Sequence, residues 1–248
     1  MKNKIKTIAI IGGGPAGCAL ATLLKRKGFK VAVFYLEKRP EIIVGESLVP
    51  AIIPMLRALG VEDEVKSYST YKPGASVWVS KDEEATSPFS YGGGNLPPYA
   101  YNVPRVKFDK TIFENALKEG VRFFNLTAKI EKTGNNDELK LSDDTIAGTN
   151  GYFDAQPDLI VDATGRSRTI SRLLNIPTKQ GYRKDVALFA HLSGAEKIEP
   201  YNIHLHRLEK GWNWRIPLPD RTSVGVVINP EHLKKYGTTK EEQYDNYL

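Results

Sequence analysis

Residues 7–17 read Thr-Ile-Ala-Ile-Ile-Gly-Gly-Gly-Pro-Ala-Gly, and this stretch decides the fold. The run rich in β-branched residues before the glycines is typical of a buried strand over 6–11. After the glycine turn, the pattern predicts a helix over 16–27 with Gly28 as its C-cap, and then a second strand over 30–36. Strand, glycine turn, helix and strand together form a βαβ unit.

The glycines of this turn have the G-x-G-x-x-G spacing of a dinucleotide-binding loop. Gly12 permits the tight turn, Gly14 lets the backbone approach a pyrophosphate, and Gly17 lets the helix pack closely on the strand. The phosphates are expected beside Pro15 and Ala16, because free N–H groups and the helix dipole favour anions at a helix N-terminus. The sequence therefore predicts a site for the ADP half of a dinucleotide, with FAD as the first candidate.

Composition narrows the class of protein. The chain has 248 residues, of which 41% are hydrophobic, and this is enough for one sizeable core or two small ones. Its one cysteine, Cys18, excludes an internal disulfide framework, and no apolar run is long enough to span a bilayer. We read no signal peptide and expect a cytoplasmic protein without a membrane partner. The net charge of +6 comes from scattered basic residues, so no nucleic-acid partner is expected.

The rest of the chain continues with helices and then becomes mainly β. The patterns predict an interrupted helix over 47–59, a strand over 74–80, an irregular loop over 86–98, a helix over 108–119, a hairpin over 126–141 around Gly134-Asn135-Asn136, a strand over 159–162, a short helix over 168–174 and a β region over 186–228. This order implies a Rossmann-like α/β FAD-binding domain with an inserted, mainly β substrate domain. The expected boundaries are 1–70 and 102–178 for the FAD-binding domain, and 71–101 and 179–248 for the substrate sheet.

Four further segments carry a resemblance to a known family. They are Gly45-Glu46-Ser47-Leu48-Val49-Pro50, Pro104-Arg105, Asp162-Ala163-Thr164-Gly165 and Gly211-Trp212-Asn213-Trp214-Arg215-Ile216-Pro217. From Lys6 to about Asn229 the chain resembles the FAD-dependent aromatic hydroxylase superfamily and, within it, the flavin-dependent halogenases. The last segment contains W-x-W-x-I-P, which is the fingerprint of the halogenases. The Asp-Ala-Thr-Gly motif is shared with hydroxylases and prenyl reductases, so it supports FAD and not a particular reaction.

The resemblance implies further cofactor contacts. Asp162 and Gly165 belong to the motif that closes the FAD site, and Arg105 is expected near the flavin phosphates or ring unless it is an ordinary surface arginine. The family's ribose-binding glutamate falls on Tyr35, whereas Glu37 lies 20 residues after Gly17. Positions 35 and 37 of an extended strand share one face, so either side chain is a candidate for the ribose.

One family feature is missing from the sequence. Family members carry a second FAD motif with Gly-Asp at its heart after the W-x-W-x-I-P segment, and this sequence has no Gly-Asp dipeptide. Its last residues, from Thr239 to Glu242, resemble a capping box that opens a helix, and the sequence ends at Leu248. We therefore expect a C-terminally truncated domain, the N-terminal part of a longer enzyme, which is a poor catalyst by itself.

The resemblance also implies a chemistry. In the halogenases, reduced FAD (supplied by a separate flavin reductase), oxygen and halide yield hypohalous acid, which reaches a lysine that delivers the halogen to an aromatic ring. Lys72 is the candidate, because residues 71–76 resemble the K-x-G-A segment around that lysine. An ammonium would polarise the hypohalous acid, whereas a neutral amine would form a haloamine. The alternative is a solvated lysine, as most lysines are.

The remaining site candidates each have two interpretations. Trp212 and Trp214 share one face of a strand, where they form either a wall that separates the flavin from the substrate or ordinary core packing. Glu46 and Ser47 lie in a turn that the family uses near the flavin and halide route, although Glu46 is equally a candidate helix cap.

Three histidines, His191, His204 and His206, fall in the β region, and two of them are spaced i, i+2. Without an acidic or cysteine partner at ligand spacing they are interpreted as ordinary strand histidines, and no metal site is expected.

Three functions follow from these observations. The first is an FAD-dependent halogenase that acts on an electron-rich aromatic substrate, either free or bound to a carrier protein. The second is an FAD-dependent monooxygenase or a prenyl-type reductase of the same superfamily. The third is a truncated, non-catalytic remnant. The W-x-W-x-I-P segment and Lys72 favour the first over the second, and the absent Gly-Asp motif favours the third for the chain by itself.

Overall fold

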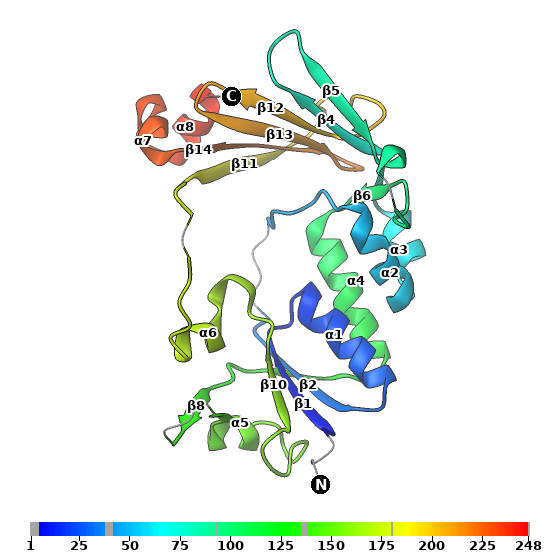
Figure 1. Ribbon diagram of the computed structural model, residues 1–248, viewed down its shortest axis with the longest axis vertical. Coiled ribbons are helices and arrows are strands. Elements are labelled where there is room, and N and C mark those ends of the chain that lie inside the picture. The colour runs from blue at the N-terminus through cyan, green and yellow to red at the C-terminus, as the bar shows by residue number, and fades with distance from the viewer. Residues whose placement is uncertain (1–4, 38–41, 93, 135–137, 180, 248) are drawn as a thin grey trace. The chain divides into compact units, whose positions relative to one another are not determined.

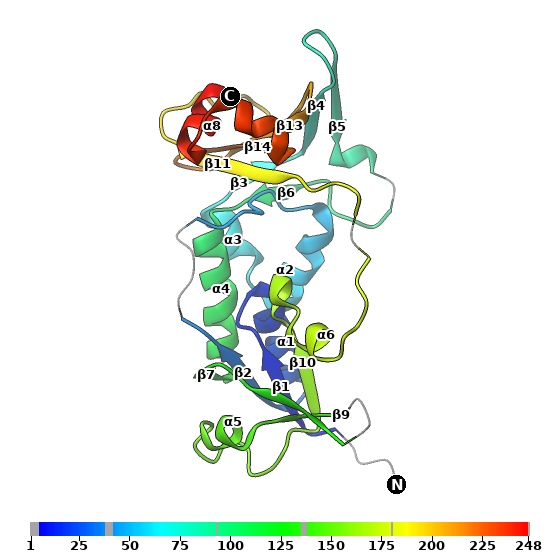
Figure 2. The ribbon, with the colours of Figure 1, turned by 90° about the vertical axis from the view of Figure 1, so that its left-hand side faces the viewer.

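The computed structural model describes residues 5–37, 42–92, 94–134, 138–179 and 181–247. The chain forms two compact units, the first from residues 1–42 and 106–178 and the second from residues 43–105 and 179–248. Figures 1 and 2 show the ribbon from two directions.

The first unit is built on a four-stranded parallel sheet in the order β10-β1-β2-β7. Its strands are β1 (Thr7–Ile11), β2 (Lys30–Tyr35), β7 (Arg122–Asn125) and β10 (Leu159–Asp162). Helix α1 (Pro15–Arg26) follows the glycine turn, and helix α4 (Arg105–Lys118) precedes β7 (Figure 1). The central strands β1 and β2 are buried along nearly their whole length, as their β-branched sequences require.

The other face of this sheet is covered by a hairpin and short helices. The hairpin pairs β8 (Ile130–Thr133) with β9 (Glu138–Leu141), and α5 (Asp143–Ala147) follows. The alternate side chains of β1 and β2 form a core cluster with residues of this layer: Ala9, Ile11, Ala32, Phe34, Ala128, Leu141 and Phe153. The chain then leaves β10 through η3 (Gly165–Ser167) and α6 (Thr169–Leu173).

The second unit contains a six-stranded sheet in the order β11-β14-β13-β12-β4-β5 (Figure 1). The bounds are β4 (Gly74–Trp78), β5 (Glu84–Pro88), β11 (Val186–Leu192), β12 (Ile203–Leu208), β13 (Gly211–Pro217) and β14 (Thr222–Ile228). All its pairs are antiparallel except β12 with β4, which join parts of the sequence more than 120 residues apart. Two core clusters form on this sheet, around Trp214 and around Val226.

A smaller two-stranded sheet of the second unit pairs β3 (Thr70–Lys72) with β6 (Ala100–Asn102). The other elements are short: η1 (Pro50–Ile52), α2 (Ile53–Leu59), α3 (Glu62–Ser67), η2 (Phe89–Tyr91), α7 (Pro230–Leu233), η4 (Lys234–Tyr236) and α8 (Lys240–Tyr247). Ser47 adds an isolated bridge to Asn102, so the segment before η1 lies along β6.

The mixed α/β fold with a parallel sheet is confirmed, and two local predictions are wrong. Residues 47–49 are not helical, because Ser47 and Leu48 bond to the backbone of β6. Residues 86–88 are not loop but belong to β5, which pairs with β4. The predicted hairpin is present, although Asn135 and Asn136 of its turn lie outside the described residues.

The compact units also divide the chain at points other than the predicted boundaries. Residues 43–70 and 102–105 belong to the second unit, because the 43–48 segment, β3 and β6 bond to one another. The assignment of cofactor and substrate roles to the two parts stays a prediction.

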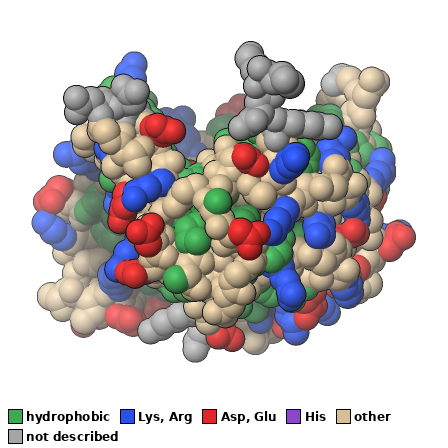
Figure 3. Space-filling view, turned by 90° about the horizontal axis from the view of Figure 1, so that it is seen from below, with side chains coloured by type: hydrophobic (Ala, Val, Ile, Leu, Met, Phe, Trp, Pro, Cys, Tyr) green, Lys and Arg blue, Asp and Glu red, His purple; other side chains and the backbone are tan. Residues whose placement is uncertain are grey.

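Charge is mixed over the surface that Figure 3 shows, where lysine and arginine side chains are interspersed with aspartate and glutamate. The net charge of +6 is therefore not gathered into one basic area on this face.

The packing of β13 on β14 leaves no room for a side chain at Gly225. A Cβ there would lie 2.2 Å from Cζ2 of Trp214. We expect Gly225→Ala to lower the free energy of unfolding by about 1–3 kcal/mol, as overpacking of a core does. Urea denaturation measures this loss. Gly181→Ala is the control, since a Cβ at Gly181 meets nothing within 4 Å, and equal stability of the two variants would contradict the prediction.

Candidate functional site

The glycine turn after β1 is packed at two of its positions and open at the third. Gly12 has φ +118°, and a Cβ there would lie 2.3 Å from the carbonyl oxygen of Ala163. A Cβ at Gly17 would lie 2.0 Å from the carbonyl oxygen of Gly12. By contrast, a Cβ at Gly14 would meet nothing within 4 Å. The turn therefore has the shape the fingerprint predicts, with Gly14 facing open space where another molecule can approach the backbone.

The helix that follows this turn offers an uncapped N-terminus. Gly14 is the N-cap of α1, Pro15 occupies the first turn, and neither a side-chain cap nor an acidic residue satisfies the first N–H groups. Twelve residues of helix stand behind this end, so the dipole favours an anion there. The geometry fits a phosphate-bearing ligand.

The Asp162–Gly165 loop lies directly against the glycine turn. Ala163 N donates to Ile11 O at 2.8 Å, and Ala163 O is the atom that excludes a side chain from Gly12. Two sequence motifs about 150 residues apart thus meet at the carboxyl ends of neighbouring parallel strands, which is where α/β sheets bind ligands. Gly165 has φ +60° and open space around it.

The carboxylate of Asp162 is engaged within its own loop. One oxygen accepts from Thr164 N at 3.0 Å and Thr164 Oγ1 at 2.6 Å, and the other accepts from Ile170 N at 2.8 Å. Burial favours the neutral acid, but the hydrogen bonds from Thr164 and from the start of α6 outweigh it and hold the pKa of Asp162 below its ordinary value. Asp162 therefore holds the conformation of the loop by hydrogen bonds, whereas a side chain at Gly165 would meet no other atom of the protein within 4 Å.

The two ribose candidates differ in their surroundings. The ring of Tyr35 packs against Phe113 and Phe123, with centroids 5.3 and 5.8 Å away. Glu37 is exposed just after β2, where Asn125 Nδ2 donates to its Oε2 at 3.2 Å. A carboxylate oxygen at the surface is available to hydroxyl groups, so the surroundings favour Glu37 over Tyr35 as a ribose ligand.

Arg105 lies in the second unit and holds a turn. Its Nη1 donates to the carbonyl oxygen of Val44 at 2.7 Å and to that of Gly45 at 3.3 Å. Gly45 has φ +101°, and a Cβ there would lie 2.7 Å from the same nitrogen. Arg105 is therefore tied to the turn that precedes Glu46.

Lys72, the predicted halogen carrier, is buried with only 2% of its surface exposed. Its Nζ donates to Ser47 Oγ at 2.7 Å and to the carbonyl oxygen of Leu48, and it lies 5.2 Å from the centre of the Phe89 ring. Among the described residues, no carboxylate forms an ion pair with it. Burial lowers the pKa of Lys72 to about 8, because desolvation disfavours the ammonium form. The interpretation as a solvated lysine is wrong.

Glu46 does not cap a helix. Its side chain is 2% exposed, and its Oε1 lies 2.7 Å from Nε2 of His191 on β11. Its carbonyl oxygen accepts from Val103 N at 2.8 Å, so the backbone here runs beside the end of β6. Glu46 with His191 and Ser47 with Lys72 therefore form two polar pairs within the second unit, and adjacent residues of one segment belong to the two pairs.

The two tryptophans of β13 have different environments. Trp214 is 5% exposed, lies over Gly225, and its Nε1 donates to Ser223 Oγ at 3.3 Å. Trp212 is 37% exposed, and the centroid of its ring lies 5.9 Å from that of Trp214. Trp214 belongs to a core cluster of the second unit, and Trp212 presents an aromatic surface on the same face of the strand.

Comparison with known proteins identifies the family. The sequence model of the family described as tryptophan halogenase matches residues 7–97 and 95–243, which is nearly the whole chain. This chain belongs to the tryptophan halogenase family. The resemblance seen in the sequence is therefore confirmed at the level of the family.

Relatives of the halogenase family agree in sequence and in fold. A flavin-dependent halogenase of Armillaria mellea is 32% identical over 92% of this chain and 47% of its own length. A flavoprotein/dehydrogenase from Cytophaga hutchinsonii is 30% identical with a TM-score of 0.79, over 96% of this chain and 59% of that one. The myxobacterial chondrochloren halogenase, titled a variant of FAD-dependent halogenases, is 25% identical with a TM-score of 0.74, over 96% of this chain and 56% of that one. The chain spans about half the length of the relatives it matches.

Sequence analysis of this halogenase-family chain missed the pairing of His191. The histidine was grouped with His204 and His206, which do behave as strand residues, since Trp78 packs against both rings at 4.9 and 4.4 Å. No signal in the sequence joins His191 to Glu46, because 145 residues separate them. Within the described ranges, no three side chains are grouped as a metal site, and no helix is both long and apolar enough to cross a membrane.

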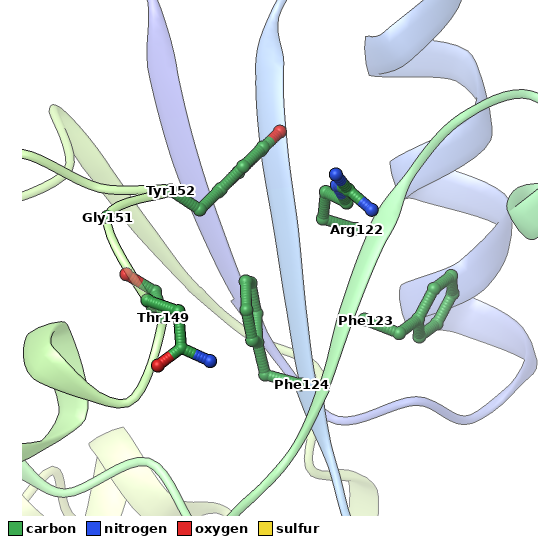
Figure 4. A pocket seen from close by; sticks show the side chains of 7 residues that line it. Arg122, Phe123, Phe124, Thr149, Gly151 and Tyr152 are labelled. Atoms are coloured by element: carbon green, nitrogen blue, oxygen red, sulfur yellow. The ribbon is translucent and has the colours of Figure 1, made fainter.

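A hollow of about 440 Å³ in the first unit lies apart from these residues. Residues 122–124 and 149–152 line it, and Figure 4 shows Tyr152 and Arg122 reaching toward each other while Phe123 points away. Arg122 begins β7, whereas the glycine turn follows the carboxyl end of β1. None of the residues that line the hollow is one of the predicted site residues.

The buried amine of Lys72 gives this family member a testable pH dependence of stability. The pKa of Lys72 is about 8 in the folded chain and near 10.5 when unfolded, so the unfolded chain binds more protons between these values. We expect the parent to gain stability relative to Lys72→Met as pH rises from 8 to 10.5. Chemical denaturation of both proteins across this window measures the difference. Parallel curves would show that the amine titrates normally.

Proposed function

We propose that this chain carries the FAD loop and the halogen-transferring lysine of an FAD-dependent halogenase, which uses reduced FAD, oxygen and halide on an electron-rich aromatic substrate. The observation that carries the proposal is the buried amine of Lys72, which no described carboxylate neutralises, in a chain of the tryptophan halogenase family. Lysine side chains are seldom fully buried unless they are paired, and a lowered pKa is typical of a lysine amine that reacts.

The glycine turn fits the ADP half of FAD. The open face of Gly14 and the uncapped start of α1 at Pro15 and Ala16 suit the pyrophosphate, and Glu37 suits the ribose hydroxyls. Asp162 holds the neighbouring loop so that Gly165 stays open to the cofactor. When bound and reduced, FAD supplies the electrons that activate oxygen.

The task of Lys72 is the transfer of halogen. In the amine route, the nitrogen lone pair takes the halogen from hypohalous acid and the products are a haloamine and water. An aromatic carbon then takes the halogen, the nitrogen–halogen bond breaks, and the ring proton is lost as the amine is regenerated. With a pKa of about 8, Lys72 is partly neutral near neutral pH, which an ordinary lysine is not.

The aromatic face of β13 and the turn before η1 support this task. Trp214 is buried in the core, and Trp212 extends this aromatic surface to the outside of the unit. We assign both tryptophans to a wall that keeps the substrate from the flavin. Arg105 holds the turn and Ser47 holds the amine, so both are assigned to positioning. A separate flavin reductase, the halide and a free or carrier-bound substrate complete the proposal, in the cytoplasm.

FAD binding is tested at Gly14. A side chain at Gly14 meets open space in the protein, so Gly14→Val is expected to fold like the parent while its methyl groups block the pyrophosphate. We expect FAD affinity to fall at least about a hundredfold, or ~2.7 kcal/mol. Fluorescence titration with FAD and a thermal melt measure both properties. Parent-like affinity in a folded variant would contradict the assignment, whereas Gly17→Ala is expected to disturb the fold itself, since its Cβ would lie 2.0 Å from Gly12 O.

Halogen transfer is tested at Lys72 in the protein at its natural length. Lys72→Ala is expected to abolish incorporation of chloride or bromide into an aromatic panel, measured by mass spectrometry with FAD, a flavin reductase, nicotinamide and halide. Flavin oxidation should continue, because it does not need the amine. Lys72→Arg should also fail, since a guanidinium stays charged and is larger. Unchanged halogenation by the alanine variant would refute the role, and oxygen insertion by the parent would favour a monooxygenase.

The pH profile of the parent separates the two lysine chemistries. A neutral amine becomes available as pH rises through the pKa of Lys72, about 8, so the haloamine route predicts a rate that rises and levels off above that pH. An ammonium that polarises hypohalous acid predicts the reverse, a rate that falls above pH 8.

A further inference from the structure

His191 is the partner of a buried carboxylate. Its Nε2 lies 2.7 Å from Glu46 Oε1, and the two side chains are only 17% and 3% exposed. Within the part of the chain that the structure describes, the imidazole is the only group hydrogen-bonded to this carboxylate. A buried carboxylate without a hydrogen-bond partner is costly, so Glu46 depends on His191 for its place.

The backbone around Glu46 connects this pair to Lys72. Glu46 O accepts from Val103 N at 2.8 Å, and Leu48 N donates to Tyr101 O at 3.0 Å. Consecutive side chains of an extended segment point to opposite sides. On one side Glu46 meets His191, and on the other side Ser47 accepts from the amine of Lys72.

We propose that His191 is a positioning residue: by holding Glu46 it fixes the 45–48 segment, whose Ser47 and Leu48 oxygens orient the amine of Lys72. This proposal rests on the proposed function, because it assigns a task to Lys72. The strand register supports it. His191 pairs with Ser223, which pairs with Ile216 on β13, so the histidine lies on the sheet face that carries Trp214. The face with the aromatic wall is thus joined to the segment that holds the lysine.

The other strand histidines do not share this arrangement. His206 alternates with Leu205, which pairs with Trp214, so His206 lies on the opposite face of the sheet and stacks on Trp78 with centroids 4.4 Å apart. It therefore offers a matched control for the loss of a histidine from the same sheet.

The experiment compares His191→Leu, His191→Gln and His206→Leu by hydrogen exchange and by NMR of ¹³C-labelled lysine. Leucine removes the donor at similar volume, whereas glutamine keeps an N–H group for Glu46. In His191→Leu we expect the amides of Leu48 and Val103 to exchange about tenfold faster, as loss of a hydrogen bond to a charged group implies. The amide of Val226 in β14 should stay protected. The titration midpoint of Lys72 should rise by about one pKa unit, because water reaches the amine.

Activity provides the second measurement. In His191→Leu, kcat for halogenation is expected to fall about tenfold while FAD affinity stays the same, and glutamine should restore most of both kcat and amide protection. His206→Leu should match the parent in each measurement. Parent-like exchange at Leu48 and Val103 together with a parent-like Lys72 midpoint in the leucine variant would overturn the proposal.

The remaining outcomes are also decisive. If every amide of the leucine variant exchanges faster, the glutamine variant decides, since restored protection supports the proposal and unrestored protection overturns it. If Lys72→Ala still halogenates, the proposed function fails at the lysine, but the exchange and NMR data continue to report whether His191 holds the segment. The two failures are therefore distinguishable.

Discussion

The structure of the second unit around residues 45–48 depends on the hydrogen bonds that the buried amine of Lys72 needs. An ammonium group removed from water without a carboxylate is unfavourable, and the chain offsets this cost with two oxygen acceptors, Ser47 Oγ and Leu48 O, and with the face of the Phe89 ring. Both acceptors belong to a segment that is held along β6 by backbone bonds and, through Glu46, by His191. Burial thus lowers the pKa of the lysine while the surrounding bonds fix its direction, and both properties are what a transferring amine needs.

In the first unit the corresponding constraint is steric. Gly12 and Gly17 have no space for a Cβ, so the turn after β1, the start of α1 and the loop after β10 pack backbone against backbone. The contact between Gly17 and Gly12 is local in sequence, and residues 7–17 predicted the βαβ unit well: observed β1, α1 and β2 differ from the predicted segments by a residue at their ends. A Cβ at Gly14 meets nothing within 4 Å, and the approach of a pyrophosphate to this position stays a prediction.

Interactions between distant parts of the sequence could not be predicted in this way. The helix expected at 47–49 fails because β6, more than 50 residues later, takes the hydrogen bonds of this segment. A helix cap was one of two interpretations of Glu46 from its sequence neighbours, whereas its partner His191 is 145 residues away. Residues 86–88 were predicted as part of a loop because the glycines and prolines of residues 92–98 follow them, and their pairing with β4 makes them a strand. In each case the deciding bond is made by a residue that no local pattern identifies.

The glycine turn and Lys72 belong to different compact units of the chain. The cofactor loop belongs to the first unit, whereas Lys72 with its acceptors, His191 and the tryptophans belong to the second. Substitutions at Gly14 act on an open position of the loop and leave the hydrogen bonds of Lys72 untouched, and substitutions at His191 act on the segment that holds the lysine. Cofactor affinity and lysine protonation are therefore expected to vary separately, since the described hydrogen bonds of Lys72 and His191 involve no residue of the glycine turn. A loss of halogenation can accordingly be assigned to cofactor binding or to halogen transfer by measuring the two properties side by side.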